Sequence, residues 1–248
     1  MRVTVLGSSA SYAGPGQACA GHLVEGGGVR VVFDLGNGAL ANLGRLIDPA
    51  TVDAVFISHA HPDHFLDLFS LQALLRYAPQ GPAPALRVYA SEDLLERAAC
   101  LLSSHGRLEF VEAFRMAALA DGIPVRVGDM LVTPYAVEHE GTTFALVAEA
   151  DGRRMCYTSD SRPGSAVLAA ARGADLLLAD ATLPEEYAGR APHMTASQAG
   201  SLAAEAGASR LVLTHLWPTT PRHDILDSAK QAFGGPVQLA DELLTVEV

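Results

Sequence analysis

Short apolar runs separated by glycine-rich or polar breaks occupy most of the chain, a pattern typical of buried strands joined by turns and helices. Most of these runs are rich in Val, Ile and Leu and are only four to eight residues long, which favours strands over helices. The strands that this pattern predicts are residues 2–6, 20–25, 29–34, 53–58, 86–90, 109–114, 124–127, 130–139, 143–150, 153–159, 175–180, 210–214, 237–239 and 243–248.

Helical spacing of apolar residues is clearest in the segment 65–77, where Phe65, Leu68 and Leu75 fall on one face. The proline-rich stretch 78–84 ends this helix, and Ser91 is the predicted cap of the next one. The predicted helices are residues 39–47, 65–77, 91–104, 165–172, 195–206 and 221–233. A strand-rich beginning and a β-α-β end predict one domain, residues 1–248, in which two sheets pack between helices.

Composition is compatible with a large buried core, since 49% of the residues are hydrophobic and 18% are charged. No run approaches the roughly 20 apolar residues of a membrane span, so we expect no membrane association. The three cysteines form no paired motif, which favours the reducing cytoplasm. A net charge of −11 disfavours a polyanionic partner.

The chemistry is concentrated directly after the strand 53–58, in the sequence His59-Ala-His61-Pro-Asp63-His64. Side chains of a strand alternate between faces, so His59 and His61 are expected to point the same way before Pro62 turns the chain. Three imidazoles and a carboxylate so close together suit two divalent ions. Zn²⁺ is the ion that we favour, although this donor set also accepts Mn²⁺ or Fe²⁺. Histidines in an ordinary exposed loop explain this spacing poorly.

Three further donors follow apolar strands in the same manner: His139, Asp160 and His215. Together with the His-x-His-x-Asp-His motif, they make the sequence resemble the metallo-β-lactamase superfamily. The resemblance implies an α/β fold, an αβ/βα four-layer sandwich of two mixed sheets flanked by helices, with the metals at one rim. It also implies that His59, His61 and His139 hold one ion, that Asp63, His64 and His215 hold the other, and that Asp160 bridges them.

The segment from His193 to Gly200 resembles the ribonuclease Z-type phosphodiesterase branch, in which the corresponding histidine is a general acid. The resemblance therefore implies that His193 protonates the leaving oxygen, and places Asp180 where it orients His193. Asp63 is predicted to be catalytic as well as a ligand. Ser161 and Arg162 are candidates for a phosphate contact, although a simple turn explains them equally well.

The chain also departs from the transfer-RNA-processing members of that branch. The region 65–123 has no basic arm, and His215 is followed by Leu-Trp-Pro in place of Ser-Arg-Tyr. The chain is more similar to small proteins of this branch that are regarded as cyclic-nucleotide phosphodiesterases, so we favour a small phosphodiester substrate over RNA. A ribonuclease Z-type endonuclease, a thioesterase or lactonase, and a non-catalytic binding protein are the alternatives. A homodimer through the helix 65–77 is a further expectation.

Overall fold

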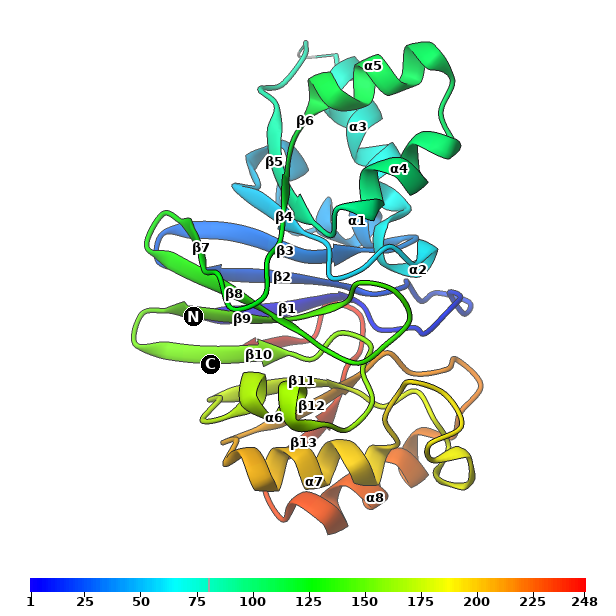
Figure 1. Ribbon diagram of the computed structural model, residues 1–248, viewed down its shortest axis with the longest axis vertical. Helices are drawn as coiled ribbons and strands as arrows, with labels where there is room; N and C mark the ends of the chain where they lie inside the picture. Colours follow the sequence, from blue (N-terminus) through cyan, green and yellow to red (C-terminus); the bar gives the residue numbers. More distant parts are fainter. Residues whose placement is uncertain (80) are drawn as a thin grey trace.

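Two seven-stranded sheets lie face to face between two layers of helices in the computed structural model (Figure 1). It describes residues 1–79 and 81–248, so Gln80, in the predicted break 78–84, lies outside the described residues. The first sheet has the order β14-β1-β2-β3-β4-β5-β6 and the second has the order β13-β12-β11-β10-β9-β8-β7. This is the predicted α/β sandwich.

The strands follow the apolar runs of the sequence closely. In the first sheet they are β1 (Arg2–Gly7), β2 (Gly21–Gly26), β3 (Val29–Leu35), β4 (Ala54–Phe56), β5 (Leu86–Ala90), β6 (Phe114–Ala118) and β14 (Thr245–Glu247). In the second they are β7 (Val125–Val127), β8 (Met130–Ala136), β9 (Phe144–Ala150), β10 (Arg153–Tyr157), β11 (Leu176–Asp180), β12 (Leu211–Thr214) and β13 (Val237–Leu239).

The helices form the two outer layers. Those beside the first sheet are α1 (Ala39–Leu43), α2 (Pro62–Phe65), α3 (Asp67–Tyr77), α4 (Asp93–Cys100) and α5 (Ser104–Ala113). Those beside the second sheet are α6 (Ser165–Ala171), α7 (Ala196–Ala206) and α8 (Arg222–Phe233). Short 3₁₀ turns, η1 (Pro49–Thr51) and η2 (Glu185–Tyr187), complete the described helical elements. Among the described helices, none is long and apolar enough to cross a membrane.

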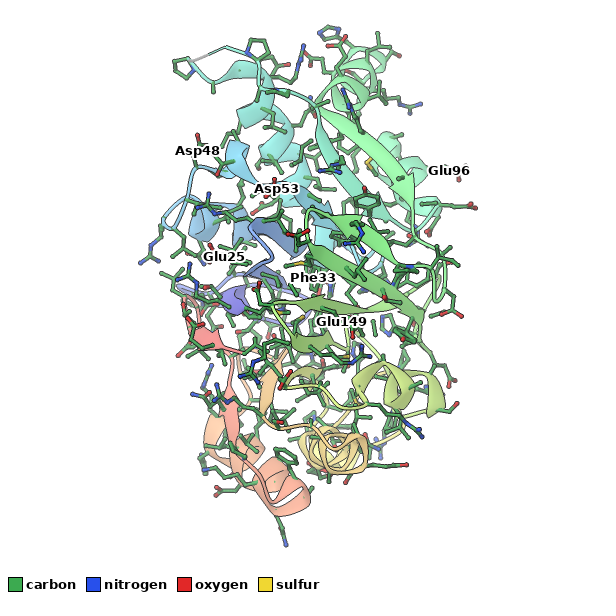
Figure 2. The ribbon with its side chains drawn as sticks, turned by 90° about the vertical axis from the view of Figure 1, so that its left-hand side faces the viewer. Glu25, Phe33, Asp48, Asp53, Glu96 and Glu149 are labelled. Atoms are coloured by element: carbon green, nitrogen blue, oxygen red, sulfur yellow. The ribbon has the colours of Figure 1, made fainter. Side chains whose placement is uncertain are left out.

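Three separate apolar clusters correspond to the three interfaces of a four-layer protein. Strand residues such as Val32 pack with α1 to α5 on one side, and residues such as Leu177 pack with α6 to α8 on the other. Between the sheets, Phe33 of the first sheet belongs to the same cluster as Leu146 of the second. Figure 2 shows Phe33 near the middle of the molecule and Asp48 at its edge. Successive side chains of a strand point alternately to the other sheet and to the helical layer, so each sheet packs at two interfaces. Both faces of each sheet are therefore apolar.

Parallel pairing places many loops at a single edge of the sandwich. Strands β3 to β6 are parallel in the first sheet, as are β10 to β13 in the second. Strand β8 points the same way as β10, because both are antiparallel to β9. The loops after these strands in each sheet consequently meet where open α/β sheets usually bind ligands.

The region 91–114 differs from the sequence prediction. The predicted strand 109–114 is wrong, because these residues lie mainly in α5, with β6 beginning at Phe114. The predicted helix 91–104 ends earlier, at Cys100, and Ser91 does not cap it with its side chain. Instead, the Ser103 hydroxyl accepts a hydrogen bond from the Gly106 backbone N–H at 3.1 Å and starts α5. Burial of Phe110 then favours the helix over an isolated strand.

Candidate metal centre

Loops at the edge shared by the two sheets bring the predicted donor residues together. His59 follows β4, while His139, Asp160 and His215 follow β8, β10 and β12. The sheets are joined here by a hydrogen bond from the Phe144 N–H to the Ser58 carbonyl, at 3.0 Å. The cluster is therefore built at the junction of both sheets.

The first group of donors contains His59, His61, His139 and Asp160. His61 Nδ1 lies 3.0 Å from His59 Nε2 and 3.3 Å from His139 Nε2. Asp160 Oδ2 lies 3.5 Å from His59 Nε2 and 3.6 Å from His139 Nε2. Two ligands of one zinc ion, each about 2.1 Å from it, are about 3.0–3.4 Å apart. The four atoms therefore have nearly the spacing of one coordination shell.

The second group contains Asp63, His64 and His215. His215 Nε2 lies 3.2 Å from both His64 Nε2 and Asp63 Oδ2. Asp160 Oδ2, which borders the first group, is also 3.4 Å from His64 Nε2. One carboxylate oxygen thus faces both groups. The structure thus brings all seven residues predicted as ligands together in the two groups just described.

Hydrogen bonds around His59 and His64 orient their free nitrogens toward the centre. Asp34 Oδ2 accepts the Ser58 hydroxyl proton at 2.8 Å, so Ser58 Oγ can accept the His59 Nδ1–H at 3.0 Å. The His64 Nδ1–H is donated to the same Asp34 oxygen at 2.7 Å. With Nδ1 protonated in each neutral ring, Nε2 presents its lone pair to a cation.

His139 and His215 are held in the same way. His139 Nδ1 donates to the carbonyl of Pro192 at 3.0 Å. The Thr182 hydroxyl lies 2.6 Å from Asp180 Oδ1 and donates to it, so Thr182 Oγ1 can accept the His215 Nδ1–H at 2.7 Å. The Nε2 atoms of both rings are consequently available at the centre.

The charge of the site also fits two divalent cations. Carboxylates surround the centre from four positions: Asp34, Asp63, Asp160 and Asp180. Four negative charges with little exposure need compensation, either by protons or by cations. Burial disfavours charge on His215, but the nearby carboxylates of Asp160, Asp180 and Asp63 outweigh it and raise the pKa of His215 to about 10. The residues present therefore fit a pair of divalent ions.

His193 lies beside both donor groups. Its ring is 4.8 Å from the ring of His139 and is stacked at 5.5 Å on that of His215, measured between centroids. Its Nδ1 donates to Asp180 Oδ2 at 2.9 Å. Burial lowers the pKa of His193, but the hydrogen bond and charge of Asp180 outweigh burial and raise it above its usual value. Thr195 begins α7 with a capping box, which positions the loop that carries His193.

Ser161 and Arg162 have structural contacts in this loop cluster. The Ser161 N–H points to Asp180 Oδ2 at 3.3 Å, and the Arg162 N–H donates to the Glu138 carbonyl at 3.1 Å. The Arg162 guanidinium is paired with the Glu138 carboxylate at 3.2 Å. These contacts tie the loop after β10 to the one after β8, and a phosphate contact stays a prediction.

Sequence reasoning missed Asp34, Ser58 and Thr182 as supports of the histidines. Asp34 offered a signal, because it ends an apolar strand as the ligands do, but the glycines that follow it favour a plain turn. Its φ of 56° and the φ of 55° at His215 are in the left-handed region, which non-glycine residues rarely adopt. Such strain persists where surrounding contacts stabilise it and is frequent at functional sites.

Comparison with known proteins assigns the family. Residues 29–216 match the family model described as "Beta-lactamase superfamily domain". An uncharacterized protein of Mycobacterium tuberculosis is 34% identical, over 99% of this chain and 92% of its own. A ribonuclease Z of Methanothermobacter thermautotrophicus is 28% identical, over 100% and 97% of the two chains.

The structure is also similar to a solved one. The metallo-β-lactamase fold protein YhfI of Bacillus subtilis superposes with a TM-score of 0.89 at 27% identity, covering 99% of both chains. By sequence the same protein, described as a probable metallo-hydrolase, is 29% identical over 97% of both chains. The chain with this paired donor cluster therefore belongs to the β-lactamase superfamily and is a metallo-hydrolase with the metallo-β-lactamase fold.

Proposed function

We propose that this protein is a dinuclear-metal phosphodiesterase that acts on a small phosphodiester such as a 3′,5′-cyclic nucleotide. His59, His61 and His139 would hold one ion, and Asp63, His64 and His215 would hold the other. Asp160 would be a ligand of both. Two divalent ions, Zn²⁺ first, would lower the pKa of a water and offset the charge of the phosphoryl oxygens. The negative net charge of the chain, −11, favours a small substrate over a nucleic acid.

The observation that carries this proposal is the pair formed by His193 and Asp180. Asp180 Oδ2 accepts the Nδ1–H of His193 at 2.9 Å and raises the pKa of the ring above its usual value, which favours a second proton on Nε2. The ring lies against His139 and His215, which places that proton beside both donor groups. A phosphodiester bound there would receive it on the leaving ribose oxygen, which needs a proton to depart.

The proposal is tested first with bis-p-nitrophenyl phosphate and protein loaded with Zn²⁺ or Mn²⁺. We expect hydrolysis, and we expect His61→Ala to reduce kcat/KM by at least about 100-fold, because one donor of the first group is lost. His223→Ala is the matched control, since His223 is largely exposed on α8 and should leave the rate unchanged. Full activity of His61→Ala would contradict the proposed centre.

The role of His193 is tested with two leaving groups. Nitrophenolate departs readily without a proton, whereas a ribose alkoxide does not. His193→Ala should therefore reduce hydrolysis of a 3′,5′-cyclic nucleotide by about 10²–10⁴-fold and hydrolysis of bis-p-nitrophenyl phosphate by much less. Equal losses for both substrates would indicate that His193 is not the general acid.

A ribonuclease Z-type endonuclease is the second candidate, supported by the relatives of that name that match along the whole chain. Zn²⁺-loaded protein should be offered a precursor transfer RNA beside the small substrates, at several salt concentrations. Efficient cleavage that falls steeply with salt would favour this candidate. Better turnover of thioesters or lactones than of phosphodiesters would instead support an acyl hydrolase.

A further inference from the structure

A cavity of about 450 Å³ lies at the edge of the second sheet that also carries the metal centre. One wall is the segment that begins at Leu183, directly after Thr182, and another begins at Trp217, two residues after His215. Strands β11 and β12 are parallel, with Asp180 opposite Thr214, so both walls leave the sheet in the same direction. The volume of the cavity is in the range of roughly 300–1,000 Å³ that is typical of small-molecule sites.

The cavity combines apolar surface with acidic side chains. Trp217, Leu183 and Ile225 provide apolar surface, while Glu186 and Asp224 provide carboxylates. No lysine, arginine or histidine is among the described residues that line it. A phosphate group would therefore be repelled here, whereas a planar uncharged group with N–H donors would be attracted.

The carboxylates of the cavity differ in their existing partners. Glu185 is occupied, because it accepts from the backbone N–H and the hydroxyl of Ser197, at 2.9 Å and 2.6 Å. Asp224 lies 2.8 Å from His223 Nε2. Glu186 lines the cavity and has no hydrogen bond or ion pair with any described residue. Glu186 is thus the acceptor that a ligand would engage.

We propose that this cavity, the Trp217 cavity, binds the nucleobase of the substrate and selects guanine. Guanine presents adjacent N1–H and N2–H donors, which one carboxylate accepts together, in the bidentate manner in which it accepts two donors of arginine. The amino group of adenine is flanked by lone pairs that a carboxylate repels, and uracil offers a single N–H between two carbonyls. The inference rests on the proposed phosphodiesterase function and adds the base to it.

Binding to the Trp217 cavity is measurable without turnover, because Trp217 is the only tryptophan of the chain. Zn²⁺-loaded protein is titrated with the 5′-monophosphates of guanosine, adenosine and uridine, which carry equal charge, while tryptophan fluorescence is excited at the red edge of its absorption. We expect saturable quenching by the guanosine nucleotide at concentrations about ten-fold lower than for the other two. Equal quenching by all three, or none, would overturn the proposal.

Substitution of Glu186 then tests the acceptor. Glu186→Gln places an amide donor opposite the guanine donors, so the affinity for the guanosine nucleotide should fall about five-fold or more, while that for the adenosine nucleotide changes little. Glu205→Gln, an exposed residue of α7 outside this cavity, is the matched control and should alter neither affinity. A guanosine affinity unaffected by Glu186→Gln would contradict the assignment.

Turnover separates this inference from the function on which it rests. The ratio of kcat/KM for 3′,5′-cyclic GMP to that for bis-p-nitrophenyl phosphate should fall about five-fold in Glu186→Gln. Absence of any phosphodiester hydrolysis by the wild-type protein would refute the proposed function, while selective quenching could still identify a guanine site. Hydrolysis of cyclic nucleotides without preference for guanine would refute the base selection alone.

Discussion

His22 is fully buried on β2, and neither of its ring nitrogens has a hydrogen-bond partner among the described residues. Its ring packs against the ring of Tyr157 in a T-shaped pair, with the centroids 4.9 Å apart. Burial lowers the pKa of His22 from its usual 6.5 to about 3, so the side chain is neutral at physiological pH. A buried polar ring without partners lowers the stability of the folded state.

Replacement of His22 by leucine should consequently stabilise the protein by about 1–2 kcal/mol at pH 7. Below pH 6.5 the unfolded wild-type chain binds a proton at His22 that the folded chain does not. The wild-type protein therefore loses stability as the pH is lowered, whereas the leucine variant does not lose stability in this way. The difference should grow by roughly 2 kcal/mol between pH 7 and pH 5. Urea unfolding at both values measures it, with the exposed His105→Leu as control. A difference that stays constant with pH would contradict the low pKa.

Asp34 is the shared acceptor behind the metal centre, because its Oδ2 accepts from His64 Nδ1, the Ser58 hydroxyl and the Tyr157 hydroxyl. Asp34→Asn should reduce Zn²⁺ affinity by about 10–100-fold, since an amide holds His64 less firmly and lowers its basicity. Competition with a chromophoric chelator measures the affinity. Asp227→Asn, at an exposed position of α8, is the control, and equal affinities in both variants would refute this role.

At the scale of elements, local sequence identified most strands and helices but failed around α5. Its last five residues, Glu-Phe-Val-Glu-Ala, include the aromatic and β-branched residues of a strand, yet they form a helix that packs Phe110 into the first helical layer. Short apolar segments are ambiguous between the two structures until their neighbours are known. By contrast, the helix predicted at residues 195–206 is present as α7, where Thr195 and Gln198 form a capping box at its start.

The start of α7 provides a test of that local signal. Thr195 is fully buried, and its hydroxyl accepts from the Gln198 N–H while the Gln198 side chain accepts from the Thr195 N–H. Thr195→Ala should therefore lower the free energy of unfolding by about 1–2 kcal/mol. Thr195→Ser keeps the hydroxyl and should retain most of that stability in urea unfolding. Equal losses in the two variants would show that the methyl group, and not the cap, matters.

At the scale of the whole molecule, metal binding is coupled to protons. Burial opposes charge on His64 and His215, but the surrounding carboxylates outweigh it and hold both pKa values above neutrality. Two imidazoles that are protonated in the metal-free protein must lose their protons before Nε2 can bind a cation. The carboxylates that attract the metal therefore also make its binding dependent on pH.

Zn²⁺ affinity should accordingly rise with pH through the neutral range, by up to about 100-fold per pH unit when both protons are released. Calorimetric titration of the metal-free protein in buffers of different ionisation enthalpy counts those protons, and we expect about two. Release of no protons at pH 7 would show that His64 and His215 are already neutral there.

The sequence alone determined the class of fold and the kinds of donor atoms. Apolar alternation, Pro and Gly breaks and the His-x-His-x-Asp-His motif are local properties, so each is recognisable within a short stretch of the chain. The placement of polar donors directly after apolar strands further indicated that distant residues such as His139 and His215 would share one edge.

Only the tertiary structure decided which atoms meet. The resemblance implied Asp160 between the ions and Asp180 beside His193, but the distances between their atoms depend on the register and packing of two sheets. The support of His64 by Asp34, which no local pattern indicated, depends on the same packing. The Trp217 cavity likewise needs β11 and β12 to be neighbours. Such contacts join residues far apart in the chain, and their geometry is set by the packing of the layers, which no local pattern records.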